Sequence, residues 1–140
     1  MQWCLILFML VVLQPLLICS VGAAERMKPI RIGVLTDSWG PTPGVVGLRD
    51  GLKELGYRED QDFVIGVRFT EGNIAALPQA ARELVKQGID ILFTNNPAPA
   101  KAAQKATNSI PIVFYGAGDP IGLGLIQSFA HPGGEHYWGH

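Results

Sequence analysis

Cysteine and histidine are scarce in this chain. It has 2 Cys and 3 His in 140 residues, and neither type occurs between residues 25 and 130. Both cysteines, Cys4 and Cys19, lie near the N-terminus, so neither a disulfide nor a thiolate metal site is expected in the remainder. All three histidines stand close to the C-terminal end: His131, His136 and His140. Catalysis by a Ser-His-Asp triad would have to recruit one of these, and a metal site built from them is not expected.

Motifs for nucleotides and phosphate are also missing. No Gly-Lys-Ser/Thr loop occurs, and Gly122-x-Gly124 is no dinucleotide fingerprint because Gln127 stands where the third glycine belongs. A phospho-accepting receiver would need Asp after the third strand, where Thr94-Asn95 stands. The 11 basic and 12 acidic residues give a net charge of −1, so neither nucleic acid nor an anionic membrane surface is indicated as a partner. No cofactor is expected.

The first 24 residues contain no charged side chain. An apolar run from Leu5 to Leu13 is followed by Gln14-Pro15 and later by the small residues 22–24, which is typical of a secretory signal peptide. Cleavage is expected after Ala24, and the protein is expected in the periplasm or outside the cell. A retained membrane anchor is the alternative. Lipidation of Cys19 is disfavoured because the preceding residue, Ile18, is large.

Short apolar runs alternate with helical periodicity along the rest of the chain. The predicted strands are Ile30–Leu35, Phe63–Phe69, Ile89–Thr94 and Ile110–Tyr115. The predicted helices are Val45–Leu55, Ile74–Val85, Pro97–Ala106 and a short one at Leu125–Ala130. Gly56 and Gly88 are expected to end the first two helices in a left-handed conformation. This order predicts an α/β fold, an open parallel sheet with helices on both faces.

Polar and aromatic residues follow each predicted strand. Ligands bind outside the carboxyl ends of the strands in an open parallel sheet, so these residues are the candidate binding site. They are Asp37, Ser38, Trp39, Glu71, Thr94, Asn95, Asn96, Tyr115 and Asp119. The set suits a small polar or zwitterionic solute. The alternative is that they are ordinary caps and turns, which Asn, Asp and Ser favour in any protein.

Individual roles are predicted for several of these residues. One of the carboxylates of Asp37, Glu71 and Asp119 is expected to face an ammonium group of the solute. Free N–H groups at the start of the helix at Pro97 are expected to hold a carboxylate. The aromatic ring of Trp39 or of Tyr115 is expected to cover an apolar part of the solute.

Five stretches together resemble a known family. "RIGVLTDS", "GLRDGLKELGY", "ALPQAARELVKQGIDILFT", "AKAAQKATNSIPIVF" and "GDPIGLGLIQSFAHPGG" are similar, in this order, to the N-terminal half of ABC-transporter substrate-binding proteins of the tryptophan/tyrosine-uptake type. The resemblance spans Ile30 to Gly134, and its most specific motifs lie at 118–120, 122–125 and 132–134. Asn95-Asn96 departs from the small Gly/Thr-type loop usual in the family, which leaves the identity of the solute open.

The resemblance implies two α/β lobes of the periplasmic-binding-protein-like type I, which close on a solute. Residues 25–134 then form the Rossmann-like N-terminal lobe, and residues 135–140, "EHYWGH", match neither the family nor a strand pattern. A frameshift, a premature stop or a truncated gene model is the expectation for this tail.

The implied function is that of an extracytoplasmic component of an importer. It would deliver a small polar solute, with an amino acid as the family-level expectation, to an ABC permease in the inner membrane. A monomer without enzymatic activity is expected. Two alternatives stay open, an inactive fragment of such a carrier and, less favoured, a small secreted α/β enzyme.

Overall fold

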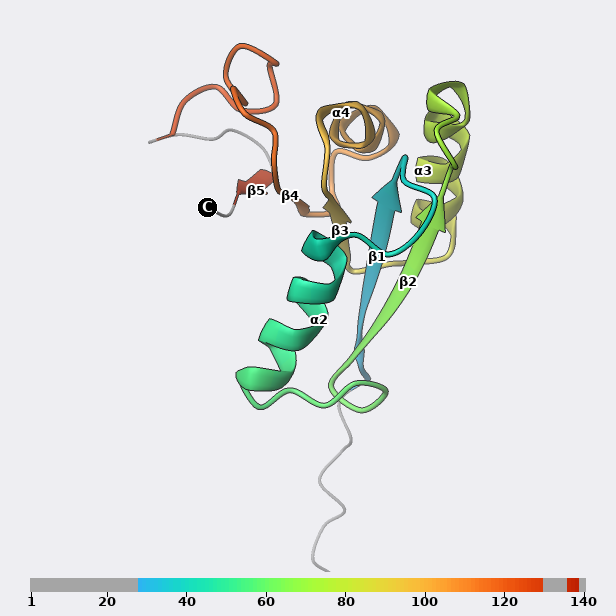
Figure 1. The fold of residues 1–140 in the computed structure, drawn as a ribbon, viewed down its shortest axis with the longest axis vertical. Coiled ribbons are helices and arrows are strands. Elements are labelled where there is room, and N and C mark those ends of the chain that lie inside the picture. Colours follow the sequence, from blue (N-terminus) through green and yellow to red (C-terminus); the bar gives the residue numbers. More distant parts are fainter. Residues whose placement is uncertain (1–27, 130–135, 139–140) are drawn as a thin grey trace, which may run out of the picture.

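Five parallel strands form one sheet in the order β2-β1-β3-β4-β5 (Figure 1). The structure, a computed structural model, describes residues 28–129 and 136–138. The strands are β1 Ile30–Thr36, β2 Phe63–Phe69, β3 Ile91–Thr94, β4 Ile112–Phe114 and β5 His136–Trp138. The predicted signal peptide with Cys4 and Cys19, and residues 135, 139 and 140 of the tail, lie outside the described residues. The prediction of an open parallel sheet is confirmed.

The register places the strand ends side by side. Thr36 of β1 pairs with Phe69 of β2, and its neighbour Leu35 pairs with Thr94 of β3. Thr94 in turn pairs with Phe114 of β4. Because all these strands run the same way, the loops that follow them emerge at one edge of the sheet.

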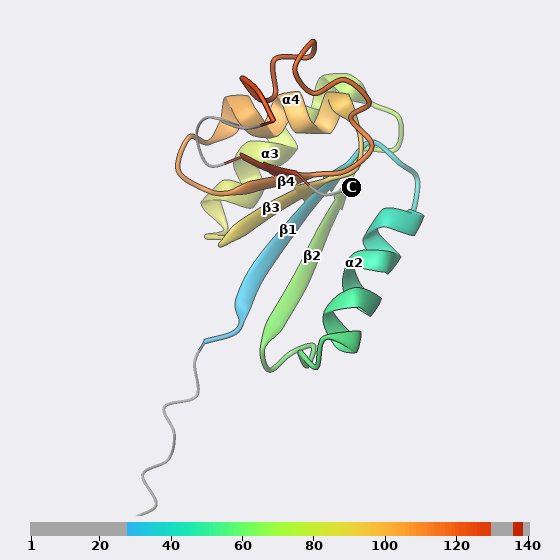
Figure 2. The ribbon, with the colours of Figure 1, turned by 90° about the vertical axis from the view of Figure 1, so that its left-hand side faces the viewer.

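Helices cover both faces of the sheet, as predicted (Figure 2). Helix α2 (Pro43–Glu54) lies on one face, and α3 (Leu77–Lys86) and α4 (Pro97–Ala106) lie on the other. A short 3₁₀ helix, η1 (Ile74–Ala76), precedes α3, so the predicted second helix is divided in two. None of the helices in the described part of the chain has the length and apolar character needed to cross a membrane.

Local sequence explains where α2 begins and ends. Thr42 caps its N-terminus, where Oγ1 accepts a hydrogen bond from the Val45 N–H at 3.4 Å, and Pro43 follows at the first helical position. Gly56 has a φ of +92°, which is cheap only for glycine and turns the chain towards β2. The predicted left-handed conformation is confirmed there and at Gly88, where φ is +71°.

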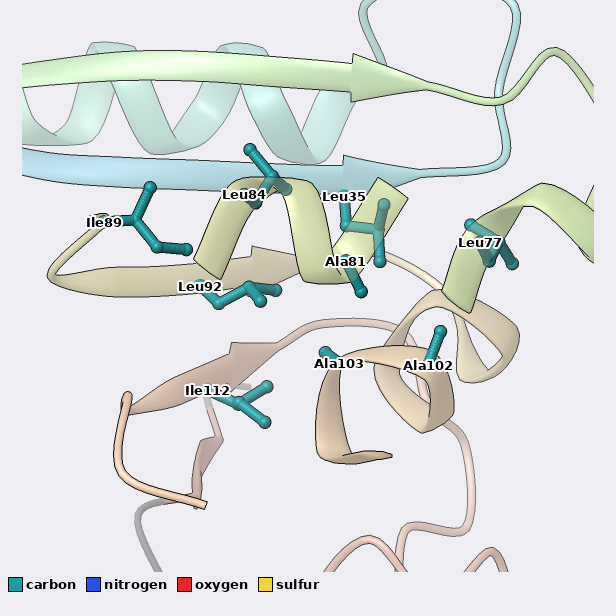
Figure 3. Packing of buried hydrophobic residues seen from close by; sticks show 9 residues of the cluster. All are labelled: Leu35, Leu77, Ala81, Leu84, Ile89, Leu92, Ala102, Ala103 and Ile112. Atoms are coloured by element: carbon teal, nitrogen blue, oxygen red, sulfur yellow. The ribbon is translucent and has the colours of Figure 1, made fainter. Parts of the chain in front are cut away.

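Alternation along the strands builds two apolar layers. Val34 of β1 is fully buried towards α2, in a cluster with Val45 and Phe93. The next residue, Leu35, points to the opposite face and packs with α3 and α4 (Figure 3). That larger cluster contains Leu35, Leu77, Ala81, Leu84, Ile89, Leu92, Ala102, Ala103 and Ile112. The alanines of α4 let this helix approach the sheet closely.

The prediction of a short helix at Leu125–Ala130 is wrong for the residues described there. A turn occupies residues 120–124 instead, and residues 125–129 are not helical. Gly124 has a φ of +64°, and the Leu125 N–H donates to the Pro120 carbonyl oxygen at 2.8 Å. These bonds reverse the chain and bury Leu125 and Ile126 in a cluster with Ala100 of α4 and Phe114 of β4.

Several element boundaries also differ from the prediction. Leu55 is 77% exposed and caps the C-terminus of α2 rather than packing on the sheet. Strand β3 begins at Ile91 and β4 is shorter than predicted. The tail was expected to match no strand pattern, yet β5 pairs in parallel with β4 through His136, Tyr137 and Trp138. Aromatic residues are enriched in strands, and the edge of β4 offers unpaired backbone groups to this segment.

Two cations of α2 bind one carboxylate in the loop before β2. Glu59 accepts from Lys53 Nζ at 2.8 Å and from Arg49 Nε at 2.9 Å. Hydrogen bonds from Lys53 first, and then from Arg49, hold the pKa of Glu59 below its usual range. A lowered pKa in the folded state stabilises the fold above the carboxyl's ordinary pKa, and this contribution disappears as the pH falls through the lowered value.

We therefore expect the Glu59→Gln variant to be slightly less stable than the wild type at neutral pH and equal to it in acid. Urea denaturation midpoints measured across the acid range check this result. Glu54→Gln, at an exposed position at the end of α2, is the matched control and should follow the wild type at every pH. The difference in stability is expected to be small, because the three side chains are partly exposed. A stability difference between wild type and Glu59→Gln that grows towards acid pH would contradict the lowered pKa of Glu59, because that difference should disappear in acid.

Candidate functional site

The loops after β1, β2, β3 and β4 meet at the carboxyl edge of the sheet. The Thr70 N–H donates to the Thr36 carbonyl oxygen at 3.1 Å, and the Gly72 N–H donates to that of Asp37 at 2.7 Å. The Tyr115 N–H donates to the Thr94 carbonyl oxygen at 2.9 Å. These backbone bonds fix the loops to one another, so their side chains form one surface.

Asp37 and Asn96 form the central polar pair of this surface. Asn96 occupies the N-cap position of α4, as predicted, but its side chain makes no capping bond. Its Nδ2 donates instead to Asp37 Oδ1 at 2.7 Å, across 59 positions of sequence. The bond ties the loop after β1 to the start of α4. Within the described part of the chain, no hydrogen bond is donated to the second carboxylate oxygen, Oδ2.

Asn95 lies beside this pair and is tied to α2. Its side chain is 9% exposed, and Nδ2 donates to Thr42 Oγ1 at 3.1 Å. The amide oxygen, Oδ1, is buried without a hydrogen-bond partner among the described residues. A buried acceptor without a partner is costly in a folded protein, so it marks a place where a ligand or a water would gain a bond.

Two residues that sequence reasoning missed shape this part of the site. Thr42 holds Asn95, and Gly44 makes room for Tyr115, because a Cβ at Gly44 would lie 3.3 Å from the Tyr115 ring. The Thr42-Pro43 start of a helix is visible in the sequence as a capping signal. The hydrogen bond that Thr42 accepts from Asn95, 53 positions away, is not visible in the sequence.

Four of the residues predicted to bind the solute either lie away from the Asp37–Asn96 pair or use their side chains within their own loop or in the protein interior. Asp119 Oδ1 accepts from the Gly122 N–H at 2.9 Å and so closes its own turn. Ser38 donates to the Gly40 carbonyl oxygen at 2.7 Å and accepts from Thr36 Oγ1. Thr94 is fully buried, and its hydroxyl has no partner among the described residues.

The fourth, Glu71, has a φ of +51° and lines a crevice of about 410 Å³ between β2 and α3. Arg68, Gln79 and Glu83 line the same crevice. The Glu71 side chain therefore contributes to a surface on the α3 side of the sheet.

Two aromatic side chains border the site and are largely open to solvent. Trp39 is 78% exposed and Tyr115 is 52% exposed. The Trp39 indole lies against Gly72, where a Cβ would stand 3.6 Å from Nε1. An apolar groove of about 360 Å³ runs from Tyr115 between α2 and the sheet. It is lined by Pro43, Gly44, Gly47, Leu48, Phe93, Val113, Phe114 and Tyr115.

The residues described bring no group of three or more His, Cys, Asp or Glu side chains together as metal ligands would be. The polar groups at the strand ends are instead one carboxylate, two amides and hydroxyls, with aromatic rings beside them. Such a set can bind a small polar molecule through hydrogen bonds and cover its apolar part.

Comparison with known proteins identifies the family. A protein-family model described as ABC transporter substrate binding protein matches residues 34–135, which include all the loops of the site. The chain belongs to this family. The resemblance seen in the sequence is thereby confirmed.

Individual proteins are also similar in sequence and structure. A curated tyrosine-binding protein of Clostridioides difficile (strain R20291) is 25% identical over 112 residues, which are 80% of this chain and 32% of that protein. A Streptococcus pneumonia ABC domain solved in complex with L-Trp has a TM-score of 0.71 at 28% identity, covering 79% of this chain and 38% of that one. A conserved domain protein of Vibrio cholerae has a TM-score of 0.72 at 31% identity, with the same coverages.

The chain spans about a third of the length of these substrate-binding relatives, since the matches cover 32% to 38% of them. The residues matched by the family model contain the end of β1, strands β2, β3 and β4, and the four strand-end loops described above.

Proposed function

We propose that this chain is the N-terminal lobe of the solute-binding component of an ABC importer. It binds an amino acid at the carboxyl edge of its sheet and presents it to a permease in the inner membrane. Family membership supports the class of protein. A relative solved with L-Trp and a curated tyrosine-binding relative support an amino acid with an aromatic side chain. The observation that carries the proposal is the Asp37–Asn96 hydrogen bond, which joins the loops after β1 and β3 at the edge of the sheet where all four strand-end loops emerge.

The site suits binding rather than catalysis. Its relatives are substrate-binding proteins, and residues 25–130 contain neither His nor Cys for nucleophilic or acid–base chemistry. The aromatic rings of Trp39 and Tyr115 offer stacking surfaces for an aromatic solute. We place the protein outside the cytoplasm on the signal-peptide pattern of residues 1–24, with the solute and the permease as its partners.

Titration of the chain with L-tryptophan and L-tyrosine tests this function. We expect saturable binding that weakens about tenfold in the Asn96→Ala variant. This variant loses the hydrogen bond that Asn96 donates to the Asp37 carboxylate at the centre of the site. NMR titration of the labelled protein measures both affinities and shows whether the variant keeps its fold. Asn108→Ala, at an exposed position after α4, is the matched control and should bind as the wild type does.

Two outcomes would count against the proposal. If neither L-tryptophan nor L-tyrosine binds to the wild type, binding of an aromatic amino acid by this chain is disproved. If both solutes bind and the Asn96→Ala variant binds them equally well, the solute site lies elsewhere on the lobe.

A further inference from the structure

The open hydrogen-bonding positions around the Asp37–Asn96 pair are mainly acceptors. Asp37 is a carboxylate, which can only accept, and it receives one bond from Asn96 at 2.7 Å. Two carboxylate oxygens together offer about four lone-pair positions, so most of this capacity is open. Asn95 adds a second acceptor, the Oδ1 atom, on a side chain that is only 9% exposed. A donor-rich cationic group on a ligand would satisfy the open positions of the Asp37 carboxylate.

Donors for an anionic group are few at the same place. The start of a helix normally offers free N–H groups to an anion. In α4, however, the first and third positions are Pro97 and Pro99, which have no N–H. The Ala100 N–H is already bonded to the Asn96 carbonyl oxygen at 3.1 Å. Of the first four helical positions, only Ala98 keeps a free N–H for a ligand.

The cations on neighbouring elements serve other surfaces. Arg68 lines the crevice between β2 and α3, together with Glu71 and Glu83. Lys101 of α4 lies against Gly124, where a Cβ would stand 3.4 Å from Nζ. Neither makes an ion pair with Asp37 in the part of the chain that the structure describes. The electrostatic character at the Asp37–Asn96 pair is therefore set by the carboxylate.

We propose that this lobe recognises the ammonium end of its ligand, rather than the carboxylate end, through Asp37. This inference rests on the proposed function, since it assigns the two ends of an amino acid. It also selects one carboxylate of the three that the sequence offers, because Asp119 closes its own turn and Glu71 lines the crevice. The α4 N-terminus, with one free N–H in its first four positions, is disfavoured as the carboxylate site.

Three indole compounds of similar shape test which charged end of the ligand this lobe binds. L-Tryptophan carries both charges, tryptamine carries only the ammonium, and indole-3-propionate carries only the carboxylate. Each is titrated by NMR into the labelled full chain, up to about 10 mM, which corresponds to weak binding of only a few kcal/mol. We expect L-tryptophan and tryptamine to bind alike and to shift the same amide signals around Asp37 and Asn96. Indole-3-propionate should bind at least about tenfold more weakly.

Substitution of the carboxylate provides the matched test. The isosteric change Asp37→Asn removes the charge and should weaken tryptamine about tenfold while leaving indole-3-propionate as weak as before. Asp50→Asn, an exposed position on α2, makes the same chemical change away from the site and should alter neither affinity. The amide spectrum of each variant reports whether it is folded.

The outcomes distinguish this inference from the function on which it rests. Binding of indole-3-propionate as tight as that of tryptamine would overturn the assignment of the ends while supporting solute binding. Unchanged tryptamine affinity in the Asp37→Asn variant would also overturn the role of Asp37, while still supporting solute binding. If none of the three probes binds at the highest concentration, the proposed function and the inference are both overturned.

Discussion

Replacing Leu92 by alanine is expected to lower the free energy of unfolding by about 2–5 kcal/mol, the range for truncating a fully buried leucine. Leu92 is 0% exposed in the middle of β3, and it packs in the cluster that joins the sheet to α3 and α4. Small domains are typically stable by only about 5–15 kcal/mol, so this loss is a large share of the total. Urea denaturation followed by circular dichroism measures the change.

The same substitution at Leu55 is the control for this prediction. Leu55 caps α2 and is 77% exposed, so Leu55→Ala removes almost no buried surface. We expect its effect to stay within about 0.5 kcal/mol, as for most surface changes. Equal losses at the two positions would show that the cluster on the α3 and α4 face does not hold the lobe together.

Local signals in the sequence were sufficient for most of the fold. The glycines at 56 and 88 act within a few residues, and the structure has them as predicted. Helix α2 begins two residues before the predicted Val45, at the Thr42-Pro43 capping signal, which is also local. Signals that depend on distant partners were misread. Leu125 was assigned to a helix on its apolar neighbours, but its burial depends on α4 and Phe114. The strand at His136–Trp138 depends on the free edge of β4.

For the candidate site, too, the sequence is sufficient for one part of the prediction and not for another. Parallel strands bring their carboxyl ends together whatever the loops contain, so the location of the site follows from the order of strands and helices. The role of each side chain does not, because the decisive bonds join residues 53 and 59 positions apart. The turn closed by Asp119 is an exception, since an Asp-Pro pair three residues before a glycine is a local turn signal.

Gly33 of β1 and its register partner Gly66 of β2 offer a second test, in which one substitution has opposite effects. A Cβ at Gly33 would lie 2.8 Å from Ile89 Cδ1 and 3.3 Å from Leu84 Cδ2, both buried in the cluster with α3. A Cβ at Gly66 would meet no atom within 4 Å. The two positions share one face of the sheet, yet only Gly33 lies under the closely packed end of α3.

We expect Gly33→Ala to lower the free energy of unfolding by about 1–3 kcal/mol, because the added methyl group overpacks a dense core. Gly66→Ala should raise it by up to about 1 kcal/mol, because alanine loses less backbone entropy than glycine on folding. Denaturation midpoints of the two variants measure the difference, and a destabilised Gly66→Ala would contradict it. Gly33 thus allows Ile89 and Leu84 to lie directly on β1, and that contact helps to hold α3 over the strand that leads to Asp37.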